Sequence, residues 1–321
     1  MDQSILNALE LFDSGAPRVA IFQLMNKITG GPEALIQLAL AFNAWMPTRT
    51  FVMHNDNESK NNAKQWFDKG YPEIAEVSAI NENELKKGDV YIIPEIKSCP
   101  KNLIEKGVKV YIWQLSNVDA SKNLAAGCKF ISHTHFLAGA NGLSLPRSHV
   151  ALPYLTRKKA HFGPVNNEKR EDLILANNDH NKKAHMHQLE KYCAHREKPC
   201  KVVLLKGFTS DQLVDLYQQA KVVVTSCLNG AERSVLEAVT YGAVLLTNYC
   251  DNGIDNRDFP IPREHMFQDV INKEEIGQVA ERMLSNFENE QAKLENLRSL
   301  YKSYGPKHLI EDTKHFMYDI V

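Results

Sequence analysis

The chain has 321 residues, of which 43% are apolar, and its formal net charge at neutral pH is −1. This near-neutral balance gives no electrostatic reason to expect binding to nucleic acid or to an anionic membrane. A chain of this length and apolar content can bury a substantial core, and its length suggests two domains.

The cysteines and the N-terminal sequence give expectations about the cellular location of the protein. The six cysteines include no Cys-x-x-Cys pair, and their spacing is neither that of a metal site nor that of a disulfide framework. We therefore expect a reducing, cytoplasmic environment. No basic segment precedes an apolar core at the N-terminus, and no run of about 18 apolar residues occurs, so neither secretion nor membrane spanning is predicted. The amphipathic stretch 2–13 lacks basic residues, which favours packing on its own domain over membrane contact.

Strand-like apolar runs alternate with helical segments through the first half of the chain. Strands are expected at 18–25, 49–54, 74–80, 89–96, 109–115 and 130–136, and helices at 61–69, 101–106 and after Pro32. This alternation predicts a parallel α/β sheet. Gly30 and Gly31 stand between the first strand and a helix, where unpaired amides favour anions. Their spacing is not GxGxxG, so a dinucleotide-binding dehydrogenase is not supported.

Two strand ends in this half carry groups suited to acid–base chemistry. Glu95 ends the strand 89–96 and is expected at the carboxyl edge of the sheet, either touching a substrate or as a surface carboxylate. His133 and His135 share one face of the strand 130–136. Structural, acid–base and metal-binding roles remain open for them, but a third metal ligand is not evident nearby.

The second half repeats the alternation after a loose segment, 138–169, that we interpret as the crossing between domains. Strands are expected at 172–176, 201–207, 221–225 and 243–247, and helices up to 195, at 209–220, 234–241, 273–287, 290–302 and 306–318. Thr209 and Gln212 form the pattern of a capping box at the start of one helix.

The loop from Ser226 to Arg233 is the strongest candidate site. It lies between a strand and a helix, and Gly230 allows close backbone approach to a ligand. Ser234 and Glu237 match a capping box, so Glu237 has either a capping role, a ligand role or both. Helix amides, acceptors and Arg233 together suit a ligand with several hydroxyls and a phosphate.

The segment from Asn229 to Val244 resembles the donor-binding segment of GT-B glycosyltransferases, especially the retaining family 4, or group 1, type. That family has two glutamates separated by seven residues: the second falls on Glu237, and the first falls on Asn229. Glu232 is a nearby carboxylate that can compensate. Gly30 and Gly31 resemble the glycine-rich loop that faces the donor phosphates in the same enzymes. The family's phosphate-binding Arg falls on Asn177, and its Lys on Lys182 or Lys183.

The resemblance implies an α/β protein of the GT-B fold, with two Rossmann-like domains whose parallel sheets face across a cleft. Residues 1–155 would form the acceptor-side domain, 156–305 the nucleotide-sugar domain, and 306–321 a C-terminal helix that returns to the first domain in this family. The implied activity is metal-independent, retaining transfer of a sugar from a nucleoside diphosphate sugar, such as a UDP- or GDP-sugar, to a glycan or glycoconjugate. No cofactor and no metal are expected.

The predicted site combines both halves of the chain. The predicted catalytic residues are Glu232, Glu95 and His133. The predicted donor-binding residues are Gly30, Gly31, Asn177, Lys182, Lys183, Lys206, Gly207, Asn229, Gly230, Ala231, Arg233, Leu236 and Glu237. Two alternatives remain open: a non-catalytic GT-B protein that binds a sugar nucleotide or a glycan, which the replacements at Asn177 and Asn229 favour, and a nucleotide-sugar epimerase.

Overall fold

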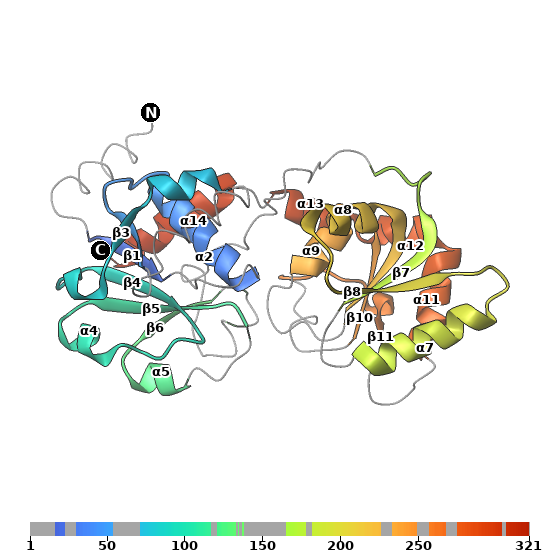
Figure 1. The fold of residues 1–321 in the computed structure, drawn as a ribbon, viewed down its shortest axis with the longest axis horizontal. Helices are drawn as coiled ribbons and strands as arrows, with labels where there is room; N and C mark the ends of the chain where they lie inside the picture. Colours follow the sequence, from blue (N-terminus) through green and yellow to red (C-terminus); the bar gives the residue numbers. More distant parts are fainter. Residues whose placement is uncertain are drawn as a thin grey trace. The chain divides into compact units, whose positions relative to one another are not determined.

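The chain folds into two α/β domains (Figure 1). The computed structural model describes residues 17–22, 30–53, 71–116, 121–132, 134, 137, 165–177, 182–225, 233–248, 257–267, 275–303 and 306–320. The first domain comprises Met1–Pro153 together with Pro306–Val321, and the second comprises Tyr154–Gly305.

The sheet of the first domain has six parallel strands in the order β3-β2-β1-β4-β5-β6. They are β1 (Val19–Phe22), β2 (Thr50–Met53), β3 (Ser78–Ile80), β4 (Val90–Pro94), β5 (Lys109–Gln114) and β6 (Lys129–Ser132). The helices are α2 (Gly30–Asn43), α4 (Lys101–Glu105), α5 (Ser121–Ala125) and α14 (Pro306–Ile320), with 3-10 turns η1 (Pro72–Glu76) and η2 (Glu82–Glu84). The strand order reverses between β1 and β4, which makes this pair the topological switch point of the sheet.

The sheet of the second domain has five parallel strands in the order β11-β10-β9-β7-β8. They are β7 (Glu171–Asn177), β8 (Lys201–Leu205), β9 (Ala220–Thr225), β10 (Val244–Asn248) and β11 (Met266–Phe267). The helices are α7 (Lys182–His195), α8 (Ser210–Gln219), α9 (Arg233–Thr240), α11 (Glu275–Ser285), α12 (Phe287–Lys293) and α13 (Glu295–Ser303), with the 3-10 turn η3 (Arg263–His265). The order here reverses between β7 and β9, which is the second switch point.

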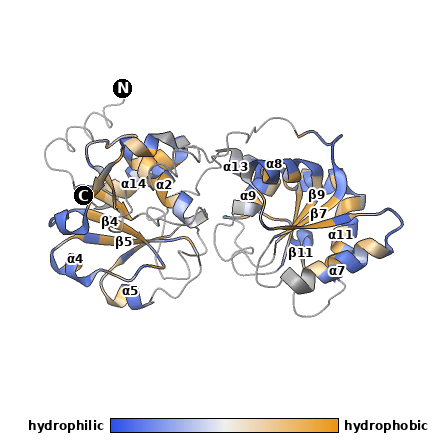
Figure 2. Cartoon of the chain, viewed as in Figure 1, coloured by the Kyte–Doolittle hydropathy of each residue, from blue (hydrophilic) through white to orange (hydrophobic). Residues whose placement is uncertain are grey.

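Each sheet is the core of its own domain. The strands are mostly hydrophobic along their length, as Figure 2 shows for β4, β5 and β7. In β4, all five residues from Val90 to Pro94 are buried. Strands buried on both faces read as continuous apolar runs in the sequence, which is why the runs predicted strands so directly.

The last helix belongs to the first domain. Trp45, just after α2, donates its indole N–H to Thr313 Oγ1 of α14 at 3.0 Å. Phe316 of α14 packs edge-on against Phe42, with ring centroids 6.1 Å apart, and against Tyr111 of β5 at 5.0 Å. These contacts hold α14 against α2 and against β5.

The C-terminus of α9 shows why Gly242 follows this helix. The N–H of Ala243 donates to Ala238 O at 2.9 Å, and that of Gly242 to Val239 O at 3.0 Å, which together form a Schellman motif. Gly242 has φ of +87°, and a Cβ there would clash with Val165 and Arg170. Glycine is therefore required both by the backbone and by packing.

Three expectations about elements need correction. The strand expected at 130–136 ends at Ser132, and Thr134 lies in a bend. The strand expected at 74–80 begins only at Ser78, because residues 72–76 form η1. The helix expected at 290–302 is divided at Leu294 into α12 and α13. The expected helix 61–69, the stretch 2–13 and most of the segment 138–169 lie outside the described residues.

The expectation that the cysteines lack disulfide spacing is wrong. Cys99 is bonded to Cys128, and Cys193 to Cys200, with Cα–Cα distances of 6.5 and 5.2 Å. The first bridge joins residues 29 positions apart, and both cysteines lie at the hydrophobic core of the first domain. Cysteine spacing therefore gives no support for a reducing compartment, and a cytoplasmic location stays a prediction.

Candidate functional site

Ligands of open parallel sheets bind beside the carboxyl ends of the strands, at the point where strand order reverses. In the first domain this point is the end of β1 and β4, and in the second it is the end of β7 and β9. A ligand site is therefore expected at these two edges.

Glu95 lies at the carboxyl end of β4 and is tied to the next strand. Ser116, two residues after β5, donates its hydroxyl to Glu95 Oε1 at 2.7 Å. Glu95 Oε2 is buried and accepts no hydrogen bond from the residues that the structure describes. Backbone hydrogen bonds from Leu115 and Ser116 also act on this carboxyl group.

The surroundings of Glu95 change its acidity. Burial raises the pKa of this carboxyl above its usual range, and the hydrogen bond from Ser116 opposes that rise only in part. A carboxyl group with a raised pKa at a ligand-binding edge exchanges protons more readily near neutral pH than an exposed glutamate does. Glu95 is thereby suited to acid–base work.

A lysine missed by the sequence analysis stands at the same edge. Lys97 follows Glu95 by two residues, and its ammonium lies 3.9 Å from the centroid of the Phe22 ring, at the end of β1. The cation–π contact holds a positive charge beside the switch point, where it favours an anionic ligand group. The sequence feature that could have identified Lys97 is its position just after the end of a strand.

The start of α2 carries Gly30 and Gly31, the two glycines predicted to face the donor phosphates. The helix begins at Gly30, so the amides of its first turn lack intrahelical partners. A Cβ on Gly31 would meet only Leu115, at an ordinary contact distance of 3.8 Å. Packing against the described residues therefore does not require glycine here. Glu33 in the same turn accepts a hydrogen bond from the Tyr71 hydroxyl at 2.5 Å.

In the second domain, Asn177 connects three elements at the switch point. It ends β7, and its Nδ2 donates to Ser234 Oγ of α9 at 3.1 Å, with a longer contact of 3.5 Å to Thr225 Oγ1 at the end of β9. Asn177 thus fixes the start of α9 against the sheet. This contact positions α9. An arginine at the same place has a longer side chain and would not make the same contact.

The capping box proposed for Ser234 and Glu237 is not formed. The helix α9 begins one residue earlier, at Arg233, and Ser234 Oγ accepts from Asn177. Glu237 therefore lies beyond the first turn of α9 as the structure describes it. Its side chain is 2% exposed, and that of Leu236 is 4% exposed. The role of Glu237 at the site stays a prediction.

Further candidates lie at the same edge. Lys182 and Lys183 begin α7, which follows β7. Lys206 and Gly207 directly follow β8; Gly207 has φ of +79°, and a Cβ on it would meet nothing within 4 Å. Phe208, which the sequence analysis did not single out, is 36% exposed beside this open position.

Asn229, Gly230, Ala231, Glu232 and His133 lie outside the described residues, as do the side chains of Lys182, Lys183 and Arg233. Within the described residues, no group of three or more His, Cys, Asp or Glu side chains is arranged to hold a metal ion. Among the helices in the described part of the chain, none combines the length and apolar character needed to cross a bilayer.

Comparison with solved structures extends over almost the whole chain. No protein-family model matches the sequence, and no curated protein matches it either. A glycosyltransferase from Rickettsia africae ESF-5 is 12% identical and superposes with a TM-score of 0.58 over 95% of this chain and 98% of its own. An E. coli structure described as trehalose-6-phosphate bound with UDP-2-fluoro glucose gives 11% identity and a TM-score of 0.59, over 95% and 99% of the two chains.

The chain has the GT-B fold. The predicted fold class, two Rossmann-like domains with parallel sheets, is confirmed. The GT-B fold is not confined to transferases, because a putative UDP-N-acetylglucosamine 2-epimerase from Listeria monocytogenes matches with a TM-score of 0.52 and 10% identity, over 92% of this chain and 94% of its own. Function must therefore be argued from the side chains at the two edges.

Proposed function

We propose that the chain is a glycosyltransferase that transfers a sugar from a nucleoside diphosphate sugar to a hydroxyl of a glycan or glycoconjugate. The observation that carries the proposal is the polar chemistry at both switch points. Glu95 and Ser116 pair at one, and Asn177 and Ser234 pair at the other. Sheets of this kind bind ligands at these two positions.

The second domain is assigned to the donor. Lys182 or Lys183 at the start of α7, together with the unpaired amides that begin α7 and α9, supply positive charge for a diphosphate. Glu237 is assigned to the ribose hydroxyls, and Asn229 to Glu232 to the sugar. The exposed Phe208 and the open backbone at Gly207 suit a nucleobase.

The first domain is assigned to the acceptor. As the bond between the sugar and the diphosphate breaks, the leaving oxygen gains negative charge, which the lysine and the helix amides stabilise. The acceptor hydroxyl forms the new bond and gives its proton to the carboxylate of Glu95. This scheme is metal-independent and needs no cofactor. Retention of configuration and a cytoplasmic location remain part of the proposal.

A second candidate function is nucleotide-sugar epimerisation. It is favoured by the raised pKa of Glu95, which suits proton exchange with a sugar carbon, and by the likeness to the Listeria structure. Such an enzyme converts one sugar nucleotide into another and does not need an acceptor. A non-catalytic binder is the third possibility, and it would bind the same ligand without turnover.

The proposal is tested with a panel of UDP-, GDP-, ADP- and TDP-sugars. At a concentration about 100-fold above Kd, a ligand stabilises the folded protein by about 2.7 kcal/mol, so one member should raise the melting temperature. That sugar nucleotide is then incubated with the protein alone. Slow release of nucleoside diphosphate and free sugar supports a transferase, a new sugar nucleotide indicates an epimerase, and binding alone indicates a non-catalytic protein. No shift with any member contradicts the proposal.

A further inference from the structure

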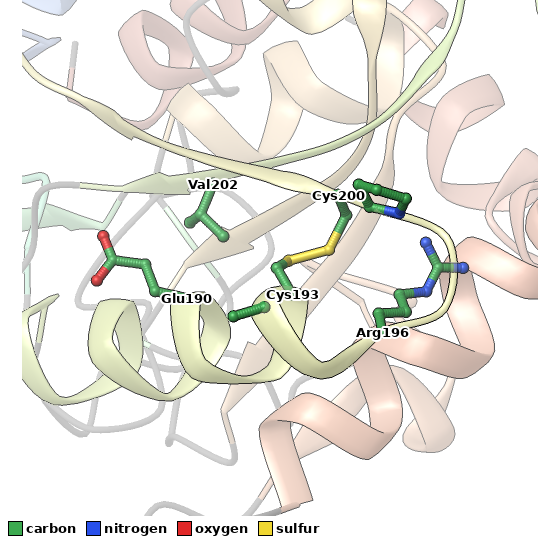
Figure 3. A pocket seen from close by; sticks show the side chains of 7 residues that line it. Glu190, Cys193, Arg196, Cys200 and Val202 are labelled. Atoms are coloured by element: carbon green, nitrogen blue, oxygen red, sulfur yellow. A yellow bond between two sulfur atoms is a disulfide. The ribbon is translucent and has the colours of Figure 1, made fainter.

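The connection between α7 and β8 holds a disulfide beside a cavity. Cys193, in the last turn of α7, is bonded to Cys200, which directly precedes β8. Both line a cavity of about 380 Å³, together with Glu190, Arg196 and Val202 (Figure 3). Cys193 is 8% exposed and Cys200 is half-buried, so a small molecule in the cavity meets the bond from the Cys200 side.

The other disulfide has different surroundings. Cys128 is a member of the hydrophobic core of the first domain, alongside Ile93 and Phe130, and Cys99 packs against that core. The backbone N–H of Cys99 also donates to Asn123 Oδ1 at 3.2 Å. Cys99 is half-buried, as Cys200 is, so the two bridges differ in what lies beside them: this one packs against the hydrophobic core, and Cys193–Cys200 lines a cavity.

Ion pairs hold the α7–β8 connection independently of its disulfide. Arg196 donates from Nη1 to Asp172 Oδ2 at 2.7 Å and from Nε to Glu281 Oε2 at 2.6 Å. Lys221 Nζ donates to the other oxygen of Asp172 at 2.6 Å. The Asp172 side chain is 4% exposed, and these donors overcome the effect of its burial and lower its pKa to about 2. The carboxylate therefore stays charged, and the Arg196 anchor persists, at any physiological pH.

We propose that Cys193–Cys200 is a reversible redox-modification site that reacts with a small dithiol. A thiolate of the reductant attacks Cys200 Sγ, which forms a mixed disulfide and releases Cys193 as a thiolate that takes up a proton. The second thiol of the reductant then attacks its own sulfur in the mixed disulfide and releases Cys200. Two electrons pass from the dithiol to the protein, and the products are two cysteine thiols and the oxidised, cyclic reductant.

Reduction loosens only the short connection. The segment 194–200 loses its covalent closure, but Arg196 still binds α11 through Glu281 and β7 through Asp172. The disulfide therefore has only a local effect, and the sheet and the core of the second domain do not depend on it. This inference does not rest on the glycosyltransferase proposal.

The test is timed reduction of the native full-length protein with dithiothreitol, followed by alkylation and peptide mass spectrometry. Cys193 and Cys200 should be labelled about tenfold or more faster than Cys99 and Cys128, because access controls the rate of exchange. Reoxidation should restore the unlabelled state. Labelling of Cys99 and Cys128 first, or of all four cysteines at one rate, overturns the proposal, as does resistance of Cys193–Cys200 until the protein unfolds.

Variants separate the local effect from unfolding. In Cys193→Ser, amide hydrogen exchange in 194–198 should rise about tenfold or more without reductant, while the strands of the second sheet stay protected. The matched variant Cys99→Ser should leave exchange in 194–198 unchanged. Wild-type protein after dithiothreitol should reproduce the pattern of Cys193→Ser. Unchanged exchange in 194–198 in both the variant and the reduced wild type contradicts a redox-controlled connection.

Discussion

The two sheets are alike in architecture and differ in the chemistry at their carboxyl edges. Both are all-parallel, with apolar strands and one reversal of order. The edge of the first domain presents a carboxyl group with a raised pKa beside a lysine held on an aromatic ring. The edge of the second presents neutral hydrogen-bonding groups at Asn177 and Ser234 and the buried carboxylate of Glu237. The fold supplies the location of a site, and the side chains decide whether that site moves protons or holds a ligand.

The largest effect is expected at Glu95, where a substitution should change the rate of proton transfer without changing ligand binding. Glu95→Gln should lower the rate of donor hydrolysis or sugar transfer by about 100-fold or more, because acid–base groups contribute about 100- to 10,000-fold. Nucleotide affinity, measured by calorimetry, should stay unchanged. Equal losses of nucleotide affinity and rate would contradict the assignment of proton transfer to the first edge and nucleotide binding to the second.

The same variant has a pH signature in stability. The pKa of Glu95 is raised in the folded protein, so ionisation of this carboxyl costs stability as pH rises from the usual glutamate pKa of 4.5 to the raised value. The melting temperature of Glu95→Gln should match that of the wild type below pH 4.5 and exceed it at about pH 8. If the variant is less stable than the wild type at the higher pH, burial is not the cause of a raised pKa at Glu95.

Substitutions of Glu237 test the role of the carboxyl edge of the second sheet. Glu237→Ala should weaken nucleotide binding by about tenfold or more, the loss expected on removing a charged hydrogen-bond acceptor of the ligand. Glu237→Gln keeps the volume and part of the hydrogen bonding, so it should lose less. A folded Glu237→Ala protein with wild-type affinity removes Glu237 from the site.

A smaller effect is expected at Asn177, which positions α9. Asn177→Ala removes the hydrogen bond to Ser234, worth about 1 kcal/mol, and should weaken nucleotide binding by about fivefold. The matched change in the first domain is Ser116→Ala, which removes the hydrogen bond to Glu95 and should leave nucleotide affinity unchanged. Equal weakening by the two variants would contradict the division between the edges.

The smallest effect on binding is expected at Asp172, near the amino end of β7. Its pKa is lowered from 3.8 to about 2, so the stability it contributes, at most about 2 kcal/mol, is present above pH 3.8 and lost as pH falls through about 2. Asp172→Asn should lower the melting temperature at pH 7, lose this acid dependence, and bind nucleotide as the wild type does. Weakened nucleotide binding at an unchanged melting temperature would place Asp172 in the site.

The sequence predicted the fold well because buried parallel strands are continuous apolar runs. The runs around 90–94, 109–114 and 220–225 all became strands, and Thr209 caps α8 as its pattern with Gln212 predicted. Contacts between distant segments could not be predicted in the same way. The hydrogen bond from Ser116 to Glu95, the Cys99–Cys128 disulfide and the hydrogen bond from Asn177 to Ser234 depend on which distant segments become neighbours, and local sequence does not encode strand order.

The central claim is that a sugar nucleotide binds at the carboxyl edge of the second sheet. The most direct test is hydrogen–deuterium exchange mass spectrometry of the full chain, with and without the sugar nucleotide that the panel identifies. The account predicts slower exchange in 178–184, 206–209 and 226–235, the segments that follow β7, β8 and β9. Protection confined to other segments, with these three unchanged at saturating ligand, would contradict it.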